Sequence, residues 1–250
     1  MRKRYIKLIF LMVCMLIFVG CQSGKNPNAA ENTDGNESVE EDVENNETVS
    51  EEGYQYSDIL LDRTKIDGKM AVFFLRGDYA VEDENGNEEA TGEATLLIAP
   101  DGTTMLVDFN DGMINGAYIA KVLQELGIQK LDYVVLTSPH AEHLGGYSIV
   151  LHCVEVGQVI TNHHEFTSNI IYNKFKKDIE EKNIQTSTVY EGDSFSFGKD
   201  VQVEVFNPAK EYTEWGKDAG QRDGALLLKF TYNQSNFLIG GDIGGAVEEQ

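Results

Sequence analysis

The sequence is poor in cysteine and in basic residues. Of its 250 residues, three are cysteine and 20 are lysine or arginine, against 42 aspartate or glutamate. The formal net charge of −22 disfavours extended nucleic acid as a partner, because such binding depends on lysine and arginine side chains that neutralise phosphates. A nucleic-acid function would need a local basic groove or metal ions.

Long apolar runs are also lacking. The chain starts with the basic segment MRKRYIK, and the run LIFLMVCMLIFVG follows. A helix that spans a bilayer needs about 20 apolar residues, so this shorter run predicts a secretory signal over residues 1–21. The run ends in FVGCQ, which resembles a bacterial lipobox with Cys21 as the lipidated cysteine. The resemblance implies an exported lipoprotein anchored to the outer face of the cell membrane; the alternative is an ordinary signal peptide with a nearby cysteine.

Residues 22–53 contain no aromatic residue and are rich in Glu, Asp, Asn and Ser. Such a segment cannot bury enough apolar surface to offset the entropy of ordering, so it is predicted to be a disordered, extended linker. Loss of Cys14 with the signal and acylation of Cys21 would leave Cys153 alone. This excludes an intramolecular disulfide.

Residues 54–250 are long enough for one domain with a sizeable core, and they keep 32 acidic and 15 basic residues. In the first half, the sequence predicts a strand over residues 69–77 and an exposed loop or protruding hairpin over 78–92. It also predicts a hairpin with a Pro-Asp-Gly turn over 92–111, a helix over 116–128 that ends at Gly127, and a buried strand over 131–138. In the second half, the sequence predicts a short helix over residues 147–156, a short strand over 158–161 and a helix over 168–183. Two or three strands follow over 189–208, then a hairpin over 224–242 and the start of a helix over 243–250. This mixture implies sheets covered by helices, an α/β (α+β) fold.

The segment TSPHAEHLGG follows the buried strand. Pro139 forces the residue before it into an extended conformation, so the next side chains stand at the mouth of the sheet. His140, Glu142 and His143 offer two imidazoles and a carboxylate, which zinc, manganese and iron accept as ligands. Gly145-Gly146 allows close approach of the backbone. The pattern favours a metal site; the alternative is a polar loop that caps a helix, with Glu142 in its first turn.

VVLTSPHAEHLGGY resembles the metal-binding signature of the metallo-β-lactamase superfamily, His-x-His-x-Asp-His, and its closest likeness is to the hydrolase-like domain of ComEC-type competence proteins. GEATLLIAPDGTTMLVDFND resembles the opening hairpin of that domain, with Asp108 at its acidic position. VYEGDSFSFG, VEVFNP and GALLLKFTYNQSNFLIGGDIG resemble the second half. The resemblance implies a four-layer αββα sandwich with the site at one edge. The sequence stops within a helix pattern, so we expect the sandwich to be incomplete at the C-terminus.

His140 and His143 match the second and last histidines of the signature, and Asp242 matches the aspartate that bridges two metals. Ser138 stands at the position of the first histidine, and Glu142 replaces the aspartate. The resemblance implies that His140, Glu142, His143 and Asp242 bind one or two divalent ions, zinc or manganese, with Glu142 and Asp242 as catalytic residues. Because metal distances tolerate changes of only ~0.2 Å, the longer Glu142 side chain requires the loop to adjust.

Further residues are weaker candidates for the site. His163 and His164 could supply an additional imidazole; the alternative is an exposed turn, since adjacent side chains of an extended chain point to opposite faces. Asp108 is the third weak candidate. His152 and Cys153 fall in a helical pattern and are predicted to be packing residues.

These features predict a surface-anchored metal-dependent hydrolase. In that superfamily, water activated by metal attacks an ester, amide or phosphoester, so the expected partner is a small-molecule or phosphoester substrate, besides the membrane contacted through the anchor. The alternative is a catalytically degenerate binding lipoprotein, which Ser138 and Glu142 favour. A purely structural spacer would need no polar cluster at a strand end, and the sequence predicts no oligomeric state.

Overall fold

The computed structural model describes residues 63–75, 80–82, 88–90, 92–162, 169–212, 222–244 and 247. All of them lie in the second of the two units into which the chain divides, residues 56–250. The predicted signal peptide, Cys21 and the acidic linker therefore lie outside the described residues. Within the described part, no helix is both long enough and apolar enough to cross a membrane.

The larger sheet has six strands in the order β1-β4-β5-β6-β7-β8. Its strands are β1 (Ala71–Phe74), β4 (Thr95–Ile98), β5 (Thr104–Val107), β6 (Lys130–Leu136), β7 (Glu155–Thr161) and β8 (Gln185–Thr188). β4 runs antiparallel to its two neighbours, β1 and β5, whereas β5 to β8 are parallel. The predicted Pro-Asp-Gly turn joins β4 to β5, with Gly102 at φ 87°.

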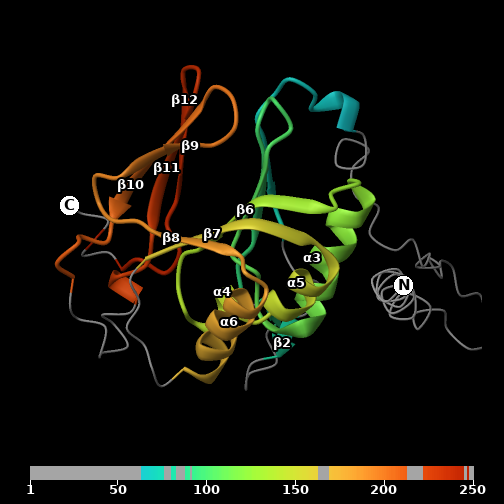
Figure 1. Ribbon diagram of the computed structural model, residues 1–250, viewed down its shortest axis with the longest axis vertical. Helices are drawn as coiled ribbons and strands as arrows, with labels where there is room; N and C mark the ends of the chain where they lie inside the picture. The colour runs from blue at the N-terminus through green and yellow to red at the C-terminus, as the bar shows by residue number, and fades with distance from the viewer. Residues whose placement is uncertain are drawn as a thin grey trace, which may run out of the picture. The chain divides into compact units, whose positions relative to one another are not determined.

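The helices cover one face of this sheet (Figure 1). They are α3 (Gly112–Glu125), α4 (Ala141–Leu144), α5 (Tyr147–Cys153) and α6 (Ile170–Glu181), and a single turn of 3-10 helix, η1 (Arg63–Lys65), precedes β1. Gly127 closes α3 as predicted, at φ 68° and with its N–H bonded to Gln124 O at 2.9 Å. The helix begins at Gly112, four residues before the predicted start, directly after the loop that follows β5.

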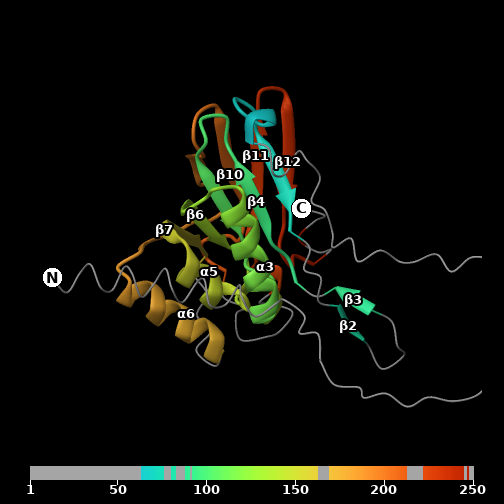
Figure 2. The same ribbon diagram turned by 90° about the vertical axis from the view of Figure 1, so that its right-hand side faces the viewer.

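The second sheet packs against the other face of the first (Figure 2). It consists of β9 (Ser194–Ser196), β10 (Val201–Asn207), β11 (Leu227–Tyr232) and β12 (Ser235–Ile239), all antiparallel, in the order β12-β11-β10-β9. Successive residues of the first sheet alternate between the two cores, since Leu96 packs with the helices and Leu97 with the second sheet. The apolar strand β6 is buried on both faces, as predicted.

The predicted α/β sandwich is confirmed, with helices, the six-stranded sheet and the four-stranded sheet as successive layers. Among the described residues no helix covers the outer face of the second sheet, where Phe206 is 48% and Leu238 is 62% exposed. The acidic segment after β1 forms a separate two-stranded hairpin, β2 (Ala80–Glu82) and β3 (Glu88–Ala90), as one of the two predictions had it.

Candidate metal centre

The strand directions explain why the candidate residues meet. β5 and β6 are parallel, so their carboxyl ends share one edge, where Asp108 follows β5 and His140 and His143 follow β6. β4 runs antiparallel to β5, which brings Glu93, just before β4, to the same edge. Asp242 follows β12 and reaches this edge from the second sheet.

Asp108 holds His143 in place. Its Oδ2 atom lies 2.9 Å from Nδ1 of His143, and only 2% and 1% of the two side chains are exposed. Thr137 donates its N–H to Oδ1 at 2.8 Å and its hydroxyl to Oδ2 at 2.5 Å. Both carboxylate oxygens are therefore engaged, so Asp108, one of the weaker candidates, orients the imidazole from behind.

Asp242 connects the two predicted histidines. Its Oδ2 lies 3.1 Å from Nδ1 of His140, and its Oδ1 lies 3.0 Å from Nε2 of His143. The second contact has an ion-pair distance, and its geometry falls short of a well-aligned hydrogen bond. The ring nitrogen and the carboxylate lie close enough together to bind one metal cation between them.

The charges of the three side chains are strongly coupled. Burial lowers the pKa of His143, but the neighbouring carboxylates of Asp108 and Asp242 outweigh burial and raise the pKa to about 10. The hydrogen bond to Asp242 likewise raises the pKa of His140. In turn, the contacts with His140 and His143 hold the pKa of Asp242 far below its usual range. Without metal, the cluster is an imidazolium–carboxylate network, and a metal at Nε2 would displace a proton.

Ser138 and Glu142, the two departures from the signature, occupy different environments. Ser138 is fully buried, and its Oγ lies 3.0 Å from Nδ1 of His140, so it supports that histidine. Glu142 lies in the first turn of α4, with 37% of its side chain exposed. Ligand atoms of His140, Glu142 and Asp242 lie within 4.8 Å of one another. The structure thus brings three of the four predicted ligands together, and the fourth, His143, adjoins them through its 3.0 Å contact with Asp242.

Two residues of the centre were missed by the sequence analysis. Ligand atoms of Glu93 lie within 4.8 Å of those of Asp108 and His143, and partial burial raises the pKa of the Glu93 carboxyl. Arg222 lies 3.8 Å from Glu142 and 3.9 Å from Asp242. The predicted hairpin could have placed Glu93 beside Asp108, since both lie at its open end. No local signal marks Arg222.

The glycines of the motif serve close packing. A Cβ atom on Gly146 would lie 2.3 Å from the carbonyl oxygen of Phe109 and 2.8 Å from Cα of Gly116. The predicted close approach is therefore to the backbone before and within α3. Gly241, at φ 44°, similarly lets the loop that carries Asp242 pass within reach of Thr137.

The remaining candidates lie elsewhere. His163 and His164 fall outside the described residues, directly after the buried Asn162 at the end of β7. His152 and Cys153 lie at the end of α5 and are partly buried, and Cys153 forms no disulfide.

The donor set fits a divalent cation. His140 and His143 offer imidazole nitrogens, and Glu142 and Asp242 offer carboxylate oxygens, a mixture that zinc and manganese both accept. The buried Nε2 of His143 faces the Asp242 carboxylate at 3.0 Å, and Asp108 supports the same ring from its other nitrogen. A carboxylate behind a histidine is the usual arrangement for a metal-binding imidazole.

Solved structures with a similar fold share little sequence with this chain. A motif mutant of the metallo-β-lactamase from Cronobacter sakazakii has a TM-score of 0.40 and 16% identity, over 67% of this chain and 59% of that chain. The metallo-β-lactamase from Hirschia baltica has a TM-score of 0.39 and 12% identity, over 68% of this chain and 65% of that chain.

Rubredoxin oxygen:oxidoreductase from the anaerobe Desulfovibrio gigas has a TM-score of 0.40 and 14% identity, over 64% of this chain and 36% of that chain. The match spans less than two thirds of each of these three proteins. No family model and no curated protein matches the sequence. The similarity to these structures is one of fold, and activity does not follow from fold alone.

Proposed function

We propose that this protein is a metal-dependent hydrolase of the metallo-β-lactamase superfamily, with His140, Glu142, His143 and Asp242 as metal ligands. The observation that carries the proposal is the buried Nε2 of His143, which lies 3.0 Å from a carboxylate that also contacts His140. Asp108 is the supporting group that a metal-binding imidazole requires.

The metal and the surrounding side chains have different roles in the proposed reaction. When bound, a divalent cation lowers the pKa of a coordinated water toward neutrality and stabilises the oxyanion that develops during hydrolysis. Asp108 and Thr137 fix the ring orientation and tautomer of His143. Glu93 belongs to the centre and also lines the adjoining cavity, where an arriving substrate would meet it. The substrate class is an ester, amide or phosphoester of a small molecule.

Metal binding and hydrolysis test the proposal together. Metal analysis of the purified protein is expected to give one or two zinc or manganese ions per chain, and chelation should remove both the metal and the hydrolysis of 4-nitrophenyl esters. His140→Ala and Asp242→Asn should each lose metal. His152→Ala is the matched control, since it removes an imidazole from α5. Less than one ion per chain, with activity that survives chelation, would refute the proposal.

Two observations favour a second candidate, a binding protein that kept the fold without catalysis. Ser138 replaces a ligand by a residue that only supports His140. Arg222 also places a positive charge near the carboxylates of Glu142 and Asp242, where it competes with a cation.

Arg222→Ala separates the two candidates. Because an exposed ion pair is worth roughly 0.2–1 kcal/mol, removal of this charge should tighten metal binding by about 1.4- to fivefold in the hydrolase. Lys121→Ala, which breaks an ion pair on α3, is the control. If neither the wild type nor Arg222→Ala binds metal in a titration, the binding protein is the better description.

The location of the protein is a separate part of the proposal. We propose that residues 1–21 direct export and that Cys21 carries the lipid that holds the protein at the outer face of the membrane. The basic start, the short apolar run and the lipobox-like FVGCQ support this part.

A further inference from the structure

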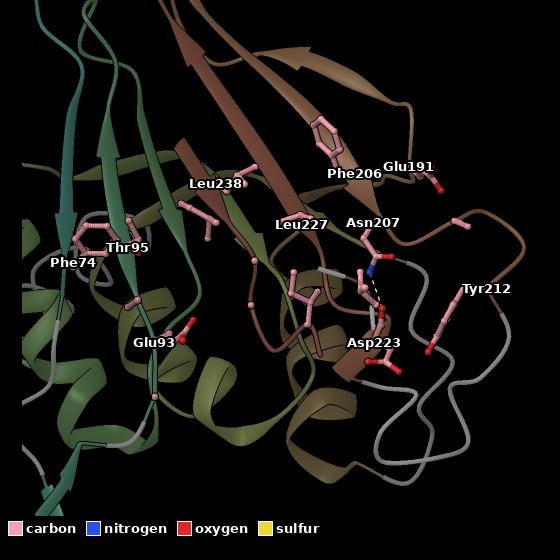
Figure 3. Close-up of a pocket in the computed structure, with 18 of the residues that line it drawn as sticks. Phe74, Glu93, Thr95, Glu191, Phe206, Asn207, Tyr212, Asp223, Leu227 and Leu238 are labelled. Carbon is pink, nitrogen blue, oxygen red and sulfur yellow. Dashed lines mark hydrogen bonds between the residues drawn. The ribbon is translucent and has the colours of Figure 1, made fainter. Parts of the chain in front are cut away.

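A cavity of about 990 Å³ opens beside the candidate metal centre. It extends from the β1–β4 edge of the first sheet to the outer face of the second sheet (Figure 3). Glu93 belongs both to the cavity wall and to the centre, and Gly241, the residue before Asp242, also lines the cavity. Its volume lies at the upper end of the range for small-molecule sites.

Apolar side chains from both sheets line this cavity. Phe74 comes from β1, Phe206 from β10, Leu227 from β11 and Leu238 from β12. Phe74 is 80% and Leu238 is 62% exposed. Apolar groups gathered around one hollow and left open to water indicate a binding surface, whereas scattered ones do not.

The charged groups of the wall have one sign. Glu93, Glu191 and Asp223 line the cavity, and none of the described lining residues is basic. Two cations that lie close by in the fold are paired with carboxylates. Arg222 reaches Glu142 and Asp242, and Lys229, above the ring of Phe206, lies 2.9 Å from Oε2 of Glu204. Away from the charge of a bound metal ion, the wall therefore attracts ammonium groups and repels phosphates.

We infer that this cavity holds the apolar part of a neutral or cationic ester or amide substrate, and that the protein rejects phosphodiesters. The inference rests on the proposed hydrolase function and names its substrate class. The scissile acyl carbon would lie at the Glu93 end, next to the centre. Water adds its hydroxyl group to that carbon, the bond to the leaving oxygen or nitrogen breaks, and the proton leaves with the alcohol or amine.

Binding can be measured apart from turnover. Calorimetric titration of the full chain would compare hexyltrimethylammonium, hexan-1-ol and hexyl phosphate, which share one alkyl chain. We expect the ammonium compound to bind at least tenfold more tightly than the phosphate, with the alcohol between them. Extension from butyl to hexyl should tighten binding by up to about fourfold per methylene, the limit for complete burial.

Variants on the cavity wall test which surface is responsible. Leu238→Ser should weaken the binding of all three compounds, whereas Glu191→Gln should weaken the binding of the ammonium compound only. The matched controls are on α6: Ile170→Ser, which removes a side chain that is 83% exposed, and Glu181→Gln. Tighter binding of hexyl phosphate, no binding of the ammonium compound, or unchanged affinity in Leu238→Ser would overturn the inference.

Turnover separates the failure of the inference from the failure of the proposed function. With metal added, 4-nitrophenyl hexanoate should be hydrolysed faster than 4-nitrophenyl acetate, and bis(4-nitrophenyl) phosphate much more slowly than either. Preferred cleavage of the phosphodiester would refute the substrate class and leave the hydrolase standing. The expected binding order without turnover of any of the three esters would refute the hydrolase and leave the ligand preference of the cavity standing.

Discussion

Asp108 has a left-handed backbone conformation, φ 60°, and an almost fully buried side chain. Non-glycine residues rarely adopt this conformation, and it costs on the order of 1 kcal/mol. Its carboxylate compensates by accepting two hydrogen bonds from Thr137 and pairing with His143. We therefore expect Asp108 to orient the imidazole of His143. Its substitution should lower metal affinity and leave the secondary structure in place.

Asp108→Asn tests this role. The amide keeps the shape but removes the charge behind His143, so metal affinity should fall by about 10- to 100-fold, as is typical for groups that support a metal ligand. The measurement is a metal titration, with circular dichroism to verify the fold. Asp101→Asn, in the exposed β4–β5 turn, serves as the control. Unchanged affinity in Asp108→Asn would show that Asp108 is only a structural residue.

The sequence could indicate the residues of the candidate centre because their types and spacing are local. His140, Glu142 and His143 lie within four positions, and Asp242 sits in a glycine-rich strand end that matches a known pattern. The supporting group Asp108 was only a weak candidate. Arg222 could not be predicted, because only the docking of the second sheet brings it to the centre.

At the scale of elements, the contact between α3 and the motif depends on glycine. Gly146→Ala should destabilise the protein by about 1–3 kcal/mol, the usual cost of overpacking, because the added Cβ meets backbone atoms that cannot rotate away. Urea unfolding measures the loss. Gly127→Ala is the comparison: nothing lies within 4 Å of its Cβ position, so only the strain of φ 68° remains. Equal losses in both variants would argue against the packing explanation.

Asp132 links β6 to β5 through hydrogen bonds, and its carboxylate leads to a prediction about the pH dependence of stability. Its Oδ2 accepts hydrogen bonds from the N–H of Thr104 at 3.0 Å and from the Thr104 hydroxyl at 3.2 Å, and Lys130 lies 3.0 Å from Oδ1. Burial raises the pKa of Asp132, but the hydrogen bonds and Lys130 together lower it below its ordinary value. The folded state therefore favours the ionised form.

The stability from Asp132 should be present above about pH 4, the ordinary range of an unfolded aspartate, and be lost as pH falls through the lower folded-state pKa. Asp132→Asn should cost about 1 kcal/mol or less at pH 7, because the side chain is 35% exposed. The difference between the variant and the wild type in urea unfolding should shrink below pH 4. A difference that stays constant from pH 7 to pH 3 would contradict this account.

Periodicity predicted most of the elements but not all of them. The apolar stripes of α3 and α6 and the continuously apolar β6 were readable because burial dictates their patterns. β8 (Gln185–Thr188) was missed, because three of its four residues are exposed and none is apolar. It is held by pairing with β7 at the sheet edge, and composition does not reveal such pairing.

At the scale of the whole molecule, the proposed lipid anchor can be tested independently of the metal. Cys21→Ser should release the protein from the membrane fraction and abolish the incorporation of labelled fatty acid. Cys153→Ser is the matched control, since it removes the cysteine of α5 and should leave both unchanged. Wild-type protein that carries no lipid label and is absent from the membrane fraction would favour an ordinary signal peptide.

The side chains of His140 and Asp242 touch although they lie 102 positions apart in the chain, one beside each sheet. The centre therefore exists only while the two sheets are docked. Any opening fluctuation that parts them must release a bound ion, so an ion at 100 times its dissociation constant suppresses such opening by about 2.7 kcal/mol. Hydrogen exchange of the amides in β11 should therefore slow as the metal concentration around the protein rises.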